Sequence, residues 1–453
     1  MWRRLLFLAS WIPLLAMHGS AAESPLADLP ISVRQALHLQ GQRHDEGPPL
    51  SLKDAVDEAL SNNLDLAALR RQLEAMRLRP AQERFLAPPM LEAEIWQWPL
   101  NTLNPWNTNM YMLMVSQELP GRGKRALRTA VADKDAMLAD IDVAVRARAI
   151  VDEVKQSYAD LFIARRAIDI HLASVDLLRE LADVAQAKYS TGRISQQDVL
   201  KAVLELSRVH DDLIKLQQQN DLARVRLNVL LNRAPDAPIG PLTGAGETML
   251  TATLPDLQRV ALEHQPELRM AQTHVEQAEA RLAVAKSDDK PDFSVTGGYM
   301  LVPHQTDAWL GRIGITWPHA PWSRGRIDAR VAEAAAGIET AKALQRSTEA
   351  MVRLAVQHAY VRVKAAEQRA GLLRTTILPQ SRQTLEVSRV AYQTDRVEFL
   401  AILDSERTLL DAQLEYFRAI SDQQRALADL ERALGADVPP EMIAPVGSSE
   451  VKP

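Results

Sequence analysis

Three methionines at alternating positions are the side chains of this 453-residue sequence best placed for chemistry. Met110, Met112 and Met114 would share one face of an extended strand. Thioether sulfur is a soft ligand that suits Cu(I), so the row suggests transfer of a soft metal such as copper or silver. A stripe of apolar side chains facing lipid or a neighbouring strand has the same pattern. We expect this second role, and we predict no metal site and no cofactor.

Motifs of known catalytic sites are absent from the sequence. It has no cysteine, and its histidines are scattered without metal-ligand spacing. The segment 121–124 lacks the spacing and the Ser or Thr of a phosphate-binding loop. There is also no nucleophile elbow and no metalloprotease His pair. We therefore predict that the protein is not an enzyme.

The N-terminus has the pattern of an export signal. Arg3 and Arg4 precede an apolar stretch, 5–17, and the small residues 20–22 form a cleavage site, which predicts a signal peptide over 1–22. Without it the formal charge falls from −5 to −7, which argues against binding to nucleic acid. An exported chain without cysteine has no disulfides and is not lipidated on an N-terminal cysteine.

A rod over 123–189 organises the rest of the chain, because it contains no proline and no interior glycine. As a helix it would reach about 100 Å at ~1.5 Å per residue. Two apolar series recur every seven residues on nearly opposite faces: Val154, Leu161, Ile168, Val175, Ala182 and Tyr189, and then Ile163, Ile170, Leu177 and Val184. A helix apolar on two flanks has a neighbour on each side, like a stave in a ring. One arm of a coiled-coil hairpin is the alternative, but the rod occurs twice.

The sequence is an internal duplication with an offset of 202 to 203 residues. Tyr158 and Tyr360 differ by 202 positions, and Tyr189 and Tyr392 differ by 203. The predicted segments after the signal peptide are an N-terminal segment 23–49, a first repeat 50–234, a connector 235–252, a second repeat 253–437 and a C-terminal tail 438–453.

Each repeat is expected to contain a helix, a strand hairpin, the rod, an exposed tip and a returning helix. In the first repeat these are helix 52–86, hairpin 90–119, rod 123–189, tip 190–195 and a helix to 231. In the second they are helix 255–287, hairpin 292–318, rod 325–392, tip 393–398 and a helix to 434. Pro379 lies inside the second rod and should bend it. The two outer helices of a repeat together match the length of its rod, so we expect them to stack end to end beside it.

All six tryptophans after the signal peptide lie in the hairpin regions. Trp suits the headgroup layer of a membrane, so Trp96, Trp98, Trp106, Trp309 and Trp317 are expected to form an aromatic girdle. Odd-numbered residues 309–317 would face lipid, and the even-numbered 312, 314 and 316 would face a wet interior. In an exported protein this predicts parts of an outer-membrane β-barrel, a soluble hairpin cap with core tryptophans being the alternative.

Four strands per chain cannot close a barrel, and open sheet edges cannot lie in lipid. Two chains would supply about eight strands, enough only for an interior filled by side chains. Three chains would supply twelve strands and a lumen, so we predict a homotrimer.

The sequence resembles the TolC family of outer-membrane efflux channels. The resemblance covers about 50–437 and rests on the repeat, on Ala59-Leu60 with Asn63, on 116–120 followed by 123–125, and on 188–192 leading into 198–200. The sequence of residues 117–125 is most similar to the heavy-metal branch typified by CzcC and CusC. The implied fold is mainly α with a small β part: long antiparallel helices form an α-barrel, and two β-hairpins per chain complete a trimeric 12-stranded membrane β-barrel.

The resemblance implies a passive exit channel in the outer membrane of a Gram-negative bacterium, with most of its mass in the periplasm. Its partners would be a periplasmic adaptor, an inner-membrane RND pump and outer-membrane lipid, and its cargo could include heavy-metal cations. The adaptor would dock on the tips, at Thr191, Gly192, Arg193, Thr394, Asp395 and Arg396. Asp395, Glu398 and Asp404 would form gate rings if they face the lumen. A soluble periplasmic coiled-coil adaptor or scaffold is the competing function.

Overall fold

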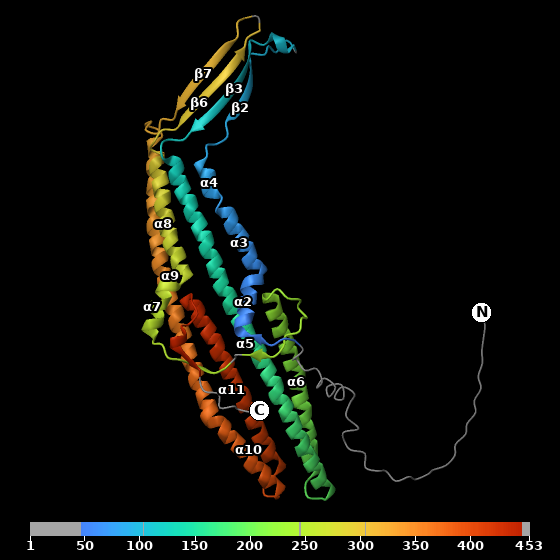
Figure 1. Ribbon diagram of the computed structural model, residues 1–453. Helices are drawn as coiled ribbons and strands as arrows, with labels where there is room; N and C mark the ends of the chain where they lie inside the picture. The colour runs from blue at the N-terminus through green and yellow to red at the C-terminus, as the bar shows by residue number, and fades with distance from the viewer. Residues whose placement is uncertain (1–46, 103, 244–245, 304, 446–453) are drawn as a thin grey trace, which may run out of the picture.

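The computed structural model describes residues 47–102, 104–243, 246–303 and 305–445. The predicted signal peptide lies outside these residues, as do most of the N-terminal segment and the end of the tail. The molecule is elongated, with a four-stranded sheet at one end, long helices through its middle and two helix-connecting turns at the other end (Figure 1). The mainly helical fold with a small β part is thus confirmed.

The first repeat contains a broken outer helix, a hairpin, a long helix and a returning helix. Its elements are β1 (Leu50–Ser51), α2 (Leu52–Asn62), α3 (Leu64–Met76), α4 (Arg79–Arg84), β2 (Met90–Trp96), η2 (Pro105–Asn107), β3 (Met110–Leu119), α5 (Lys124–Ser190) and α6 (Gln196–Leu230). Helix α5, with 67 residues, is the predicted rod. Helices α2 to α4 and α6 pack along it one after the other, so that α5 spans both (Figure 1).

The second repeat has the same order. The connector contains β4 (Leu242–Thr243) and β5 (Thr248–Leu250), and then follow α7 (Leu254–His264), α8 (Pro266–Ser287), β6 (Phe293–Leu301), β7 (Ala308–Ile315), α9 (Arg324–Leu372), the π-helical turn η3 (Leu373–Ile377), α10 (Leu378–Gln393), α11 (Phe399–Leu434), η4 (Pro440–Met442) and β8 (Ile443–Pro445). The irregularity expected at Pro379 is the π turn that immediately precedes it. Pro379 has no N–H to donate, so the α-helical bonding pattern cannot pass through it unchanged.

The single outer helices predicted over 52–86 and 255–287 are wrong, because both are interrupted. At Asn63 the backbone is extended, and the side-chain oxygen accepts a hydrogen bond from the Leu66 N–H at 3.2 Å, which caps α3. The first outer helix breaks again at Leu78, just before Pro80. At the position equivalent to Asn63, Gln265 is extended because it precedes Pro266.

The rod has neighbours on two sides, as predicted for a stave. In its lower part α5 packs against α6 and α11, and in its upper part against α3, α4 and α8 (Figure 1). The first apolar series is buried over most of its length, with Val154, Leu161 and Val175 fully buried. In the second series Ile170 is buried, whereas Val184 is exposed near the tip.

The connector is fixed to the middle of the rod by backbone and side-chain contacts. Strand β1 pairs in parallel with β4, and the Tyr158 hydroxyl lies 2.9 Å from the Leu50 carbonyl oxygen and 2.8 Å from that of Thr243. Strand β5 pairs in antiparallel orientation with β8, which follows the last long helix. These short strands join the two repeats at the level where the outer helices meet.

Candidate functional site

The two hairpins form one continuous antiparallel sheet in the order β2-β3-β6-β7. The central pairing, β3 with β6, joins the first repeat to the second, from Tyr111↔Leu301 to Leu119↔Phe293. Strands β2 and β7 remain as edges, and they run in opposite directions. Copies of this sheet placed side by side therefore continue the antiparallel order, as a closed membrane barrel requires.

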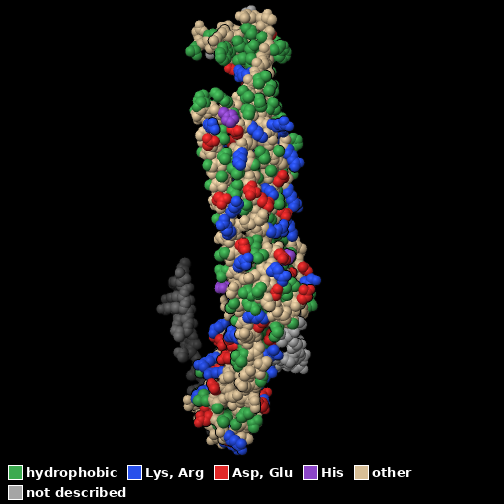
Figure 2. Space-filling model, turned by 90° about the vertical axis from the view of Figure 1, so that its left-hand side faces the viewer, with side chains coloured by type: hydrophobic (Ala, Val, Ile, Leu, Met, Phe, Trp, Pro, Cys, Tyr) green, Lys and Arg blue, Asp and Glu red, His purple; other side chains and the backbone are tan. Residues whose placement is uncertain are grey.

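The two faces of the sheet differ in chemistry. The odd-numbered residues form the first face, which is almost entirely apolar and exposed: Leu91, Ile95, Leu113, Val115, Phe293, Val295, Trp309, Ile313 and Ile315. The even-numbered residues form the second face, which carries Glu92, Glu94, Glu118 and Arg312. Lipid demands an apolar exterior, so the odd face is the outer wall and the even face lines the lumen. Figure 2 shows hydrophobic side chains gathered at the sheet end, and charged ones spread over the helices.

The five tryptophans expected to form an aromatic girdle lie at the ends of the strands and in the first hairpin loop. Trp309 lies on the outer face and is 81% exposed, and Trp317 follows β7 and is 65% exposed. Trp98 and Trp106 lie in the exposed connection between β2 and β3. Trp96 pairs with Met110 on the even face, so it does not point outward with the others.

The methionine row lies on the even face of the sheet. Met110, Met112 and Met114 are even-numbered residues of β3 and share their face with Glu92 and Glu94. Of the two surroundings expected for the row, lipid does not fit this face. A neighbouring strand does, because Met112 lies opposite Met300 of β6 and Met114 lies opposite Gly298.

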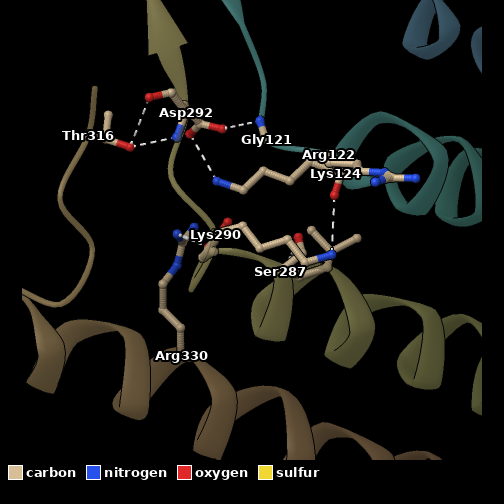
Figure 3. A network of polar contacts seen from close by, with 10 residues as sticks. Gly121, Arg122, Lys124, Ser287, Lys290, Asp292, Thr316 and Arg330 are labelled. Carbon is tan, nitrogen blue, oxygen red and sulfur yellow. Dashed lines mark hydrogen bonds and ion pairs between the residues drawn. The ribbon is translucent and has the colours of Figure 1, made fainter. Parts of the chain in front are cut away.

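A polar network joins the sheet to the helices (Figure 3). The Asp292 carboxylate accepts hydrogen bonds from the Gly121 backbone N–H at 2.7 Å and from Lys124 Nζ at 2.9 Å. The Asp292 N–H in turn donates to the Thr316 hydroxyl at 2.7 Å. Lys124 is buried, so its charge has to be matched by this carboxylate. The network holds both hairpins on one helical support, and no motif in the sequence indicates it.

At the opposite end, the first tip (190–195) connects α5 to α6. Gly192 adopts the left-handed conformation with φ 73°. The Gly192 N–H donates to the Tyr189 carbonyl at 2.9 Å, and the Arg193 N–H donates to that of Lys188 at 3.0 Å. This is the usual way to end a helix at a glycine, and it agrees with the role expected for Gly192.

The second tip (393–398) repeats that turn with a different residue. Asp395 takes the left-handed position with φ 57°, and its N–H donates to the Tyr392 carbonyl at 3.3 Å. The Arg396 N–H donates to the Ala391 carbonyl at 2.8 Å. Aspartate is one of the few residues other than glycine that tolerate this conformation, and it adds a carboxylate to the turn.

A bridge of charges connects the two tips. Lys188 Nζ lies 2.6 Å from Asp395 Oδ1, and Arg193 Nη1 lies 3.5 Å from Asp395 Oδ2. Lys188 also donates to the Tyr392 carbonyl, and its Nζ lies 4.2 Å from the centroid of the Tyr392 ring. The hydrogen bond from Lys188 lowers the pKa of Asp395 below its usual value. Lys188, which was not among the predicted site residues, is the centre of this bridge.

The three candidate gate acids have different surroundings. Asp395 is held in the bridge, whereas Glu398 lies exposed at the N-terminus of α11. Asp404 is exposed further along α11, near Arg407. The pKa of Arg407 is raised mainly by its hydrogen bond to Glu205 on α6, with smaller effects from Glu406 and Asp404. The structure therefore places Asp395 in contact with the first tip. Asp404 lies farther along α11, away from the two tips.

Above the tips, an apolar seam between the two helix pairs ends in a polar layer. The seam contains Val175, Leu178 and Leu206 on α5 and α6, packed against Phe399 and Ile402 on α11. In the layer, Ser174 donates a hydrogen bond to Glu406, whose side chain is buried between α5 and α11. Burial raises the pKa of Glu406. Only the structure reveals this carboxyl group as buried.

Within the described ranges, none of the helices combines the length and the hydropathy of a membrane span. Among the same residues, no group of three or more His, Cys, Asp or Glu side chains is arranged to hold a metal ion.

Comparison with known proteins gives consistent matches over most of the chain. The family model described as outer membrane efflux protein matches residues 55–233 and 257–436. The cobalt-zinc-cadmium resistance protein CzcC of Cupriavidus metallidurans is 23% identical over 372 residues, which cover 81% of this chain and 86% of CzcC. The toluene efflux pump outer membrane protein TtgF of Pseudomonas putida is also 23% identical, over 85% of this chain and 83% of TtgF. The solved structure of CusC has a TM-score of 0.73 at 19% identity and covers 85% and 92% of the two chains.

The family match covers both repeats of the chain. The sheet with two free edges and the long paired helices are what a channel of this family requires. The protein is a homotrimeric exit channel in the outer membrane of a Gram-negative bacterium, and most of its mass lies in the periplasm. It works with a periplasmic adaptor and an inner-membrane pump. The competing role of a soluble adaptor is therefore excluded. The family is one of channel proteins, and the chain belongs to the outer membrane efflux protein family.

Proposed function

We propose that this channel conducts metal cations, and that its two tips form a closed entrance held by the Lys188–Asp395 bridge. The bridge is the observation on which the entrance depends, because it joins α5 to the second tip, between α10 and α11, and so connects the two helix pairs. Opening the entrance requires the two pairs to separate, and separation breaks the bridge.

Sequence similarity alone does not identify the cargo. The relative named for metal resistance and the one named for toluene efflux have the same percentage identity to this chain. The even face of the sheet supports cations. Glu92 and Glu94 are exposed there, and each copy of the chain adds the same pair. A ring of carboxylates favours cations over neutral molecules and anions.

The tips are proposed as the adaptor-docking surface. Thr191, Gly192, Arg193, Thr394, Asp395 and Arg396 are all exposed, and they lie at the end of the molecule farthest from the sheet (Figure 1). An adaptor that binds Arg193 or Asp395 competes with the bridge for the same charges. Docking and opening are therefore linked in this proposal.

Three acids are proposed to form successive rings along the entrance. Asp395 and Glu398 lie in the second tip, between α10 and α11, and Asp404 lies on α11. At the equivalent positions the first helix pair, α5 and α6 with the tip between them, has Gly192, Ser195 and Lys201. At these three positions only the second helix pair carries carboxylates, and this difference supports placing that pair next to the lumen, where the carboxylates would attract cations.

A deletion strain tests the cargo. We expect it to lose tolerance to cobalt, zinc and cadmium salts and to regain it when the gene is restored, while its tolerance to toluene stays the same. Loss of toluene tolerance with unchanged metal tolerance would overturn the metal proposal and favour organic cargo. Measuring growth against both kinds of challenge in one strain makes the two outcomes directly comparable.

A further inference from the structure

The methionine row of β3 lines the lumen together with a fourth methionine from the other repeat. Met112 pairs directly with Met300 of β6 across the junction between the repeats. Residues directly opposite each other in antiparallel strands have their Cβ atoms about 4.5–5.5 Å apart. Met110 follows Met112 along the same face at roughly 6–7 Å. Three thioethers from two strands therefore meet in one region of the wall.

Carboxylates border these thioethers. Glu94 lies opposite Met112 on the other side, so that one row across the sheet reads Glu94, Met112, Met300. Glu92 occupies the same position beside Met114. Both glutamates are exposed, whereas Met110, Met112 and Met300 are half-buried on the even face. The row thus combines carboxylates, which attract cations, with thioether sulfur atoms on the even face of the sheet.

Glycine makes room for this packing. Gly298 lies opposite Met114, and a Cβ atom at position 298 would come within 2.8 Å of Met114 Cγ. Met114 fills that space and is only 4% exposed. The stripe is therefore packed into the sheet at its lower end, and its accessible part consists of Met110, Met112 and Met300.

Thioether sulfur binds soft monovalent cations such as Cu(I) and Ag(I), and it binds harder divalent cations weakly. A thioether carries no charge and no proton, so it does not hold these cations as tightly as a thiolate does. Weak, repeated sites suit a conduit, because an ion has to enter each site and leave it again. The entire sequence contains no cysteine that would trap such an ion.

We infer that Met110, Met112 and Met300 form a belt in the barrel lumen that binds soft monovalent cations in transit, with Glu94 drawing the cations to it. The belt repeats in each copy of the trimer. This inference deepens the proposed function and rests on it, because it names soft cations as a class of metal that the channel admits.

Silver binding tests the belt. The purified trimer is dialysed against silver nitrate in buffer free of chloride and thiols, and bound silver is measured. We expect the wild type to bind Ag⁺ and the Met112→Leu/Met300→Leu variant to bind it about tenfold more weakly, since leucine keeps the volume but has no sulfur. Equal affinity of the two intact trimers would overturn the inference.

Controls separate the belt from other methionines. Met137 and Met351 are 46% and 62% exposed on the helices, so Met137→Leu/Met351→Leu should leave Ag⁺ affinity unchanged. If this variant loses as much affinity as the belt variant, the belt is not special and the inference fails. If the belt double variant does not assemble as a trimer, Met112→Leu alone has to show the weaker binding, and unchanged binding again overturns the inference.

The two proposals fail in different ways. A wild-type channel that binds Ag⁺ but does not restore tolerance to cobalt, zinc or cadmium contradicts the proposed cargo and leaves the belt supported. A channel that restores tolerance but shows the same Ag⁺ affinity with and without Met112 and Met300 contradicts the belt alone.

Discussion

The first and second tips share one backbone turn but differ in the residue at its left-handed position. Gly192 occupies it with φ 73°, and Asp395 occupies it with φ 57°. Glycine adopts this conformation without strain, and aspartate tolerates it. The second tip thereby gains a carboxylate, which reaches Lys188 of the first repeat. Duplication kept the geometry of the turn, while divergence gave one copy a charge that joins the two.

The same divergence continues along the returning helices. Lys201 on α6 is replaced at the equivalent position on α11 by Asp404, and Ser195 is replaced by Glu398. The backbones of the two hairpins are equivalent, so differences in behaviour between them should follow from charge. Changes at Lys188, Asp404, Asp395 and Gly192 therefore test whether charge or the shape of the turn distinguishes the two tips.

Reversing the charge of Lys188 should have the largest effect. Lys188→Glu places a carboxylate next to Asp395, and the side chain of Lys188 is only 12% exposed, so water screens the repulsion poorly. We expect conductance of single reconstituted channels to rise about tenfold as the tips separate. Lys215→Glu, an exposed change on α6, is the control and should have no such effect. The double variant Lys188→Glu/Asp395→Asn should conduct no more than Asp395→Asn alone, because each change breaks the same pair, and additive effects of the two changes would contradict the bridge.

Removing Asp404 should have a smaller effect. Asp404→Ala takes one carboxylate per copy from α11 and is expected to raise conductance or change its dependence on the cation by about twofold. Lys201→Ala on α6 is the matched change on the first hairpin and should leave both properties the same. Unchanged conductance in Asp404→Ala would remove this residue from the gate, and an equal effect of Lys201→Ala would show that the hairpins are not distinguished by charge.

Acid should weaken the bridge only at low pH. The pKa of Asp395 is depressed in the folded protein by Lys188, so the bridge is fully present above the ordinary aspartate pKa of about 3.9. The contribution is lost as the pH falls through the depressed value. Conductance should therefore stay constant from about pH 8 to pH 5 and rise only below roughly pH 4. Asp395→Asn, which keeps the turn but not the charge, should be open throughout. A wild-type transition near pH 6 would indicate a different group.

Much of this arrangement could be predicted from the sequence, for reasons that the helices make clear. The heptad series of the rod and the turn at Gly192 depend on nearby residues, so both were predictable. The breaks at Asn63 and Gln265 also have local causes, a side-chain cap and a residue before a proline, and the prediction missed them although both signals are present in the sequence. The bridge and the burial of Glu406 join residues about 200 positions apart, and no local pattern reports such contacts.

The smallest expected effect concerns the conformation of the first tip alone. Gly192→Ala adds a Cβ that meets no atom within 4 Å, so the only cost is the left-handed backbone, about 1 kcal/mol. Hydrogen exchange of the amides in 190–195 should become roughly fivefold faster, because local opening costs that much less. Conductance should stay the same, since Lys188 and Asp395 are untouched. A rise in conductance as large as that of Lys188→Glu would mean that the shape of the turn, and not the charge it carries, keeps the two tips together.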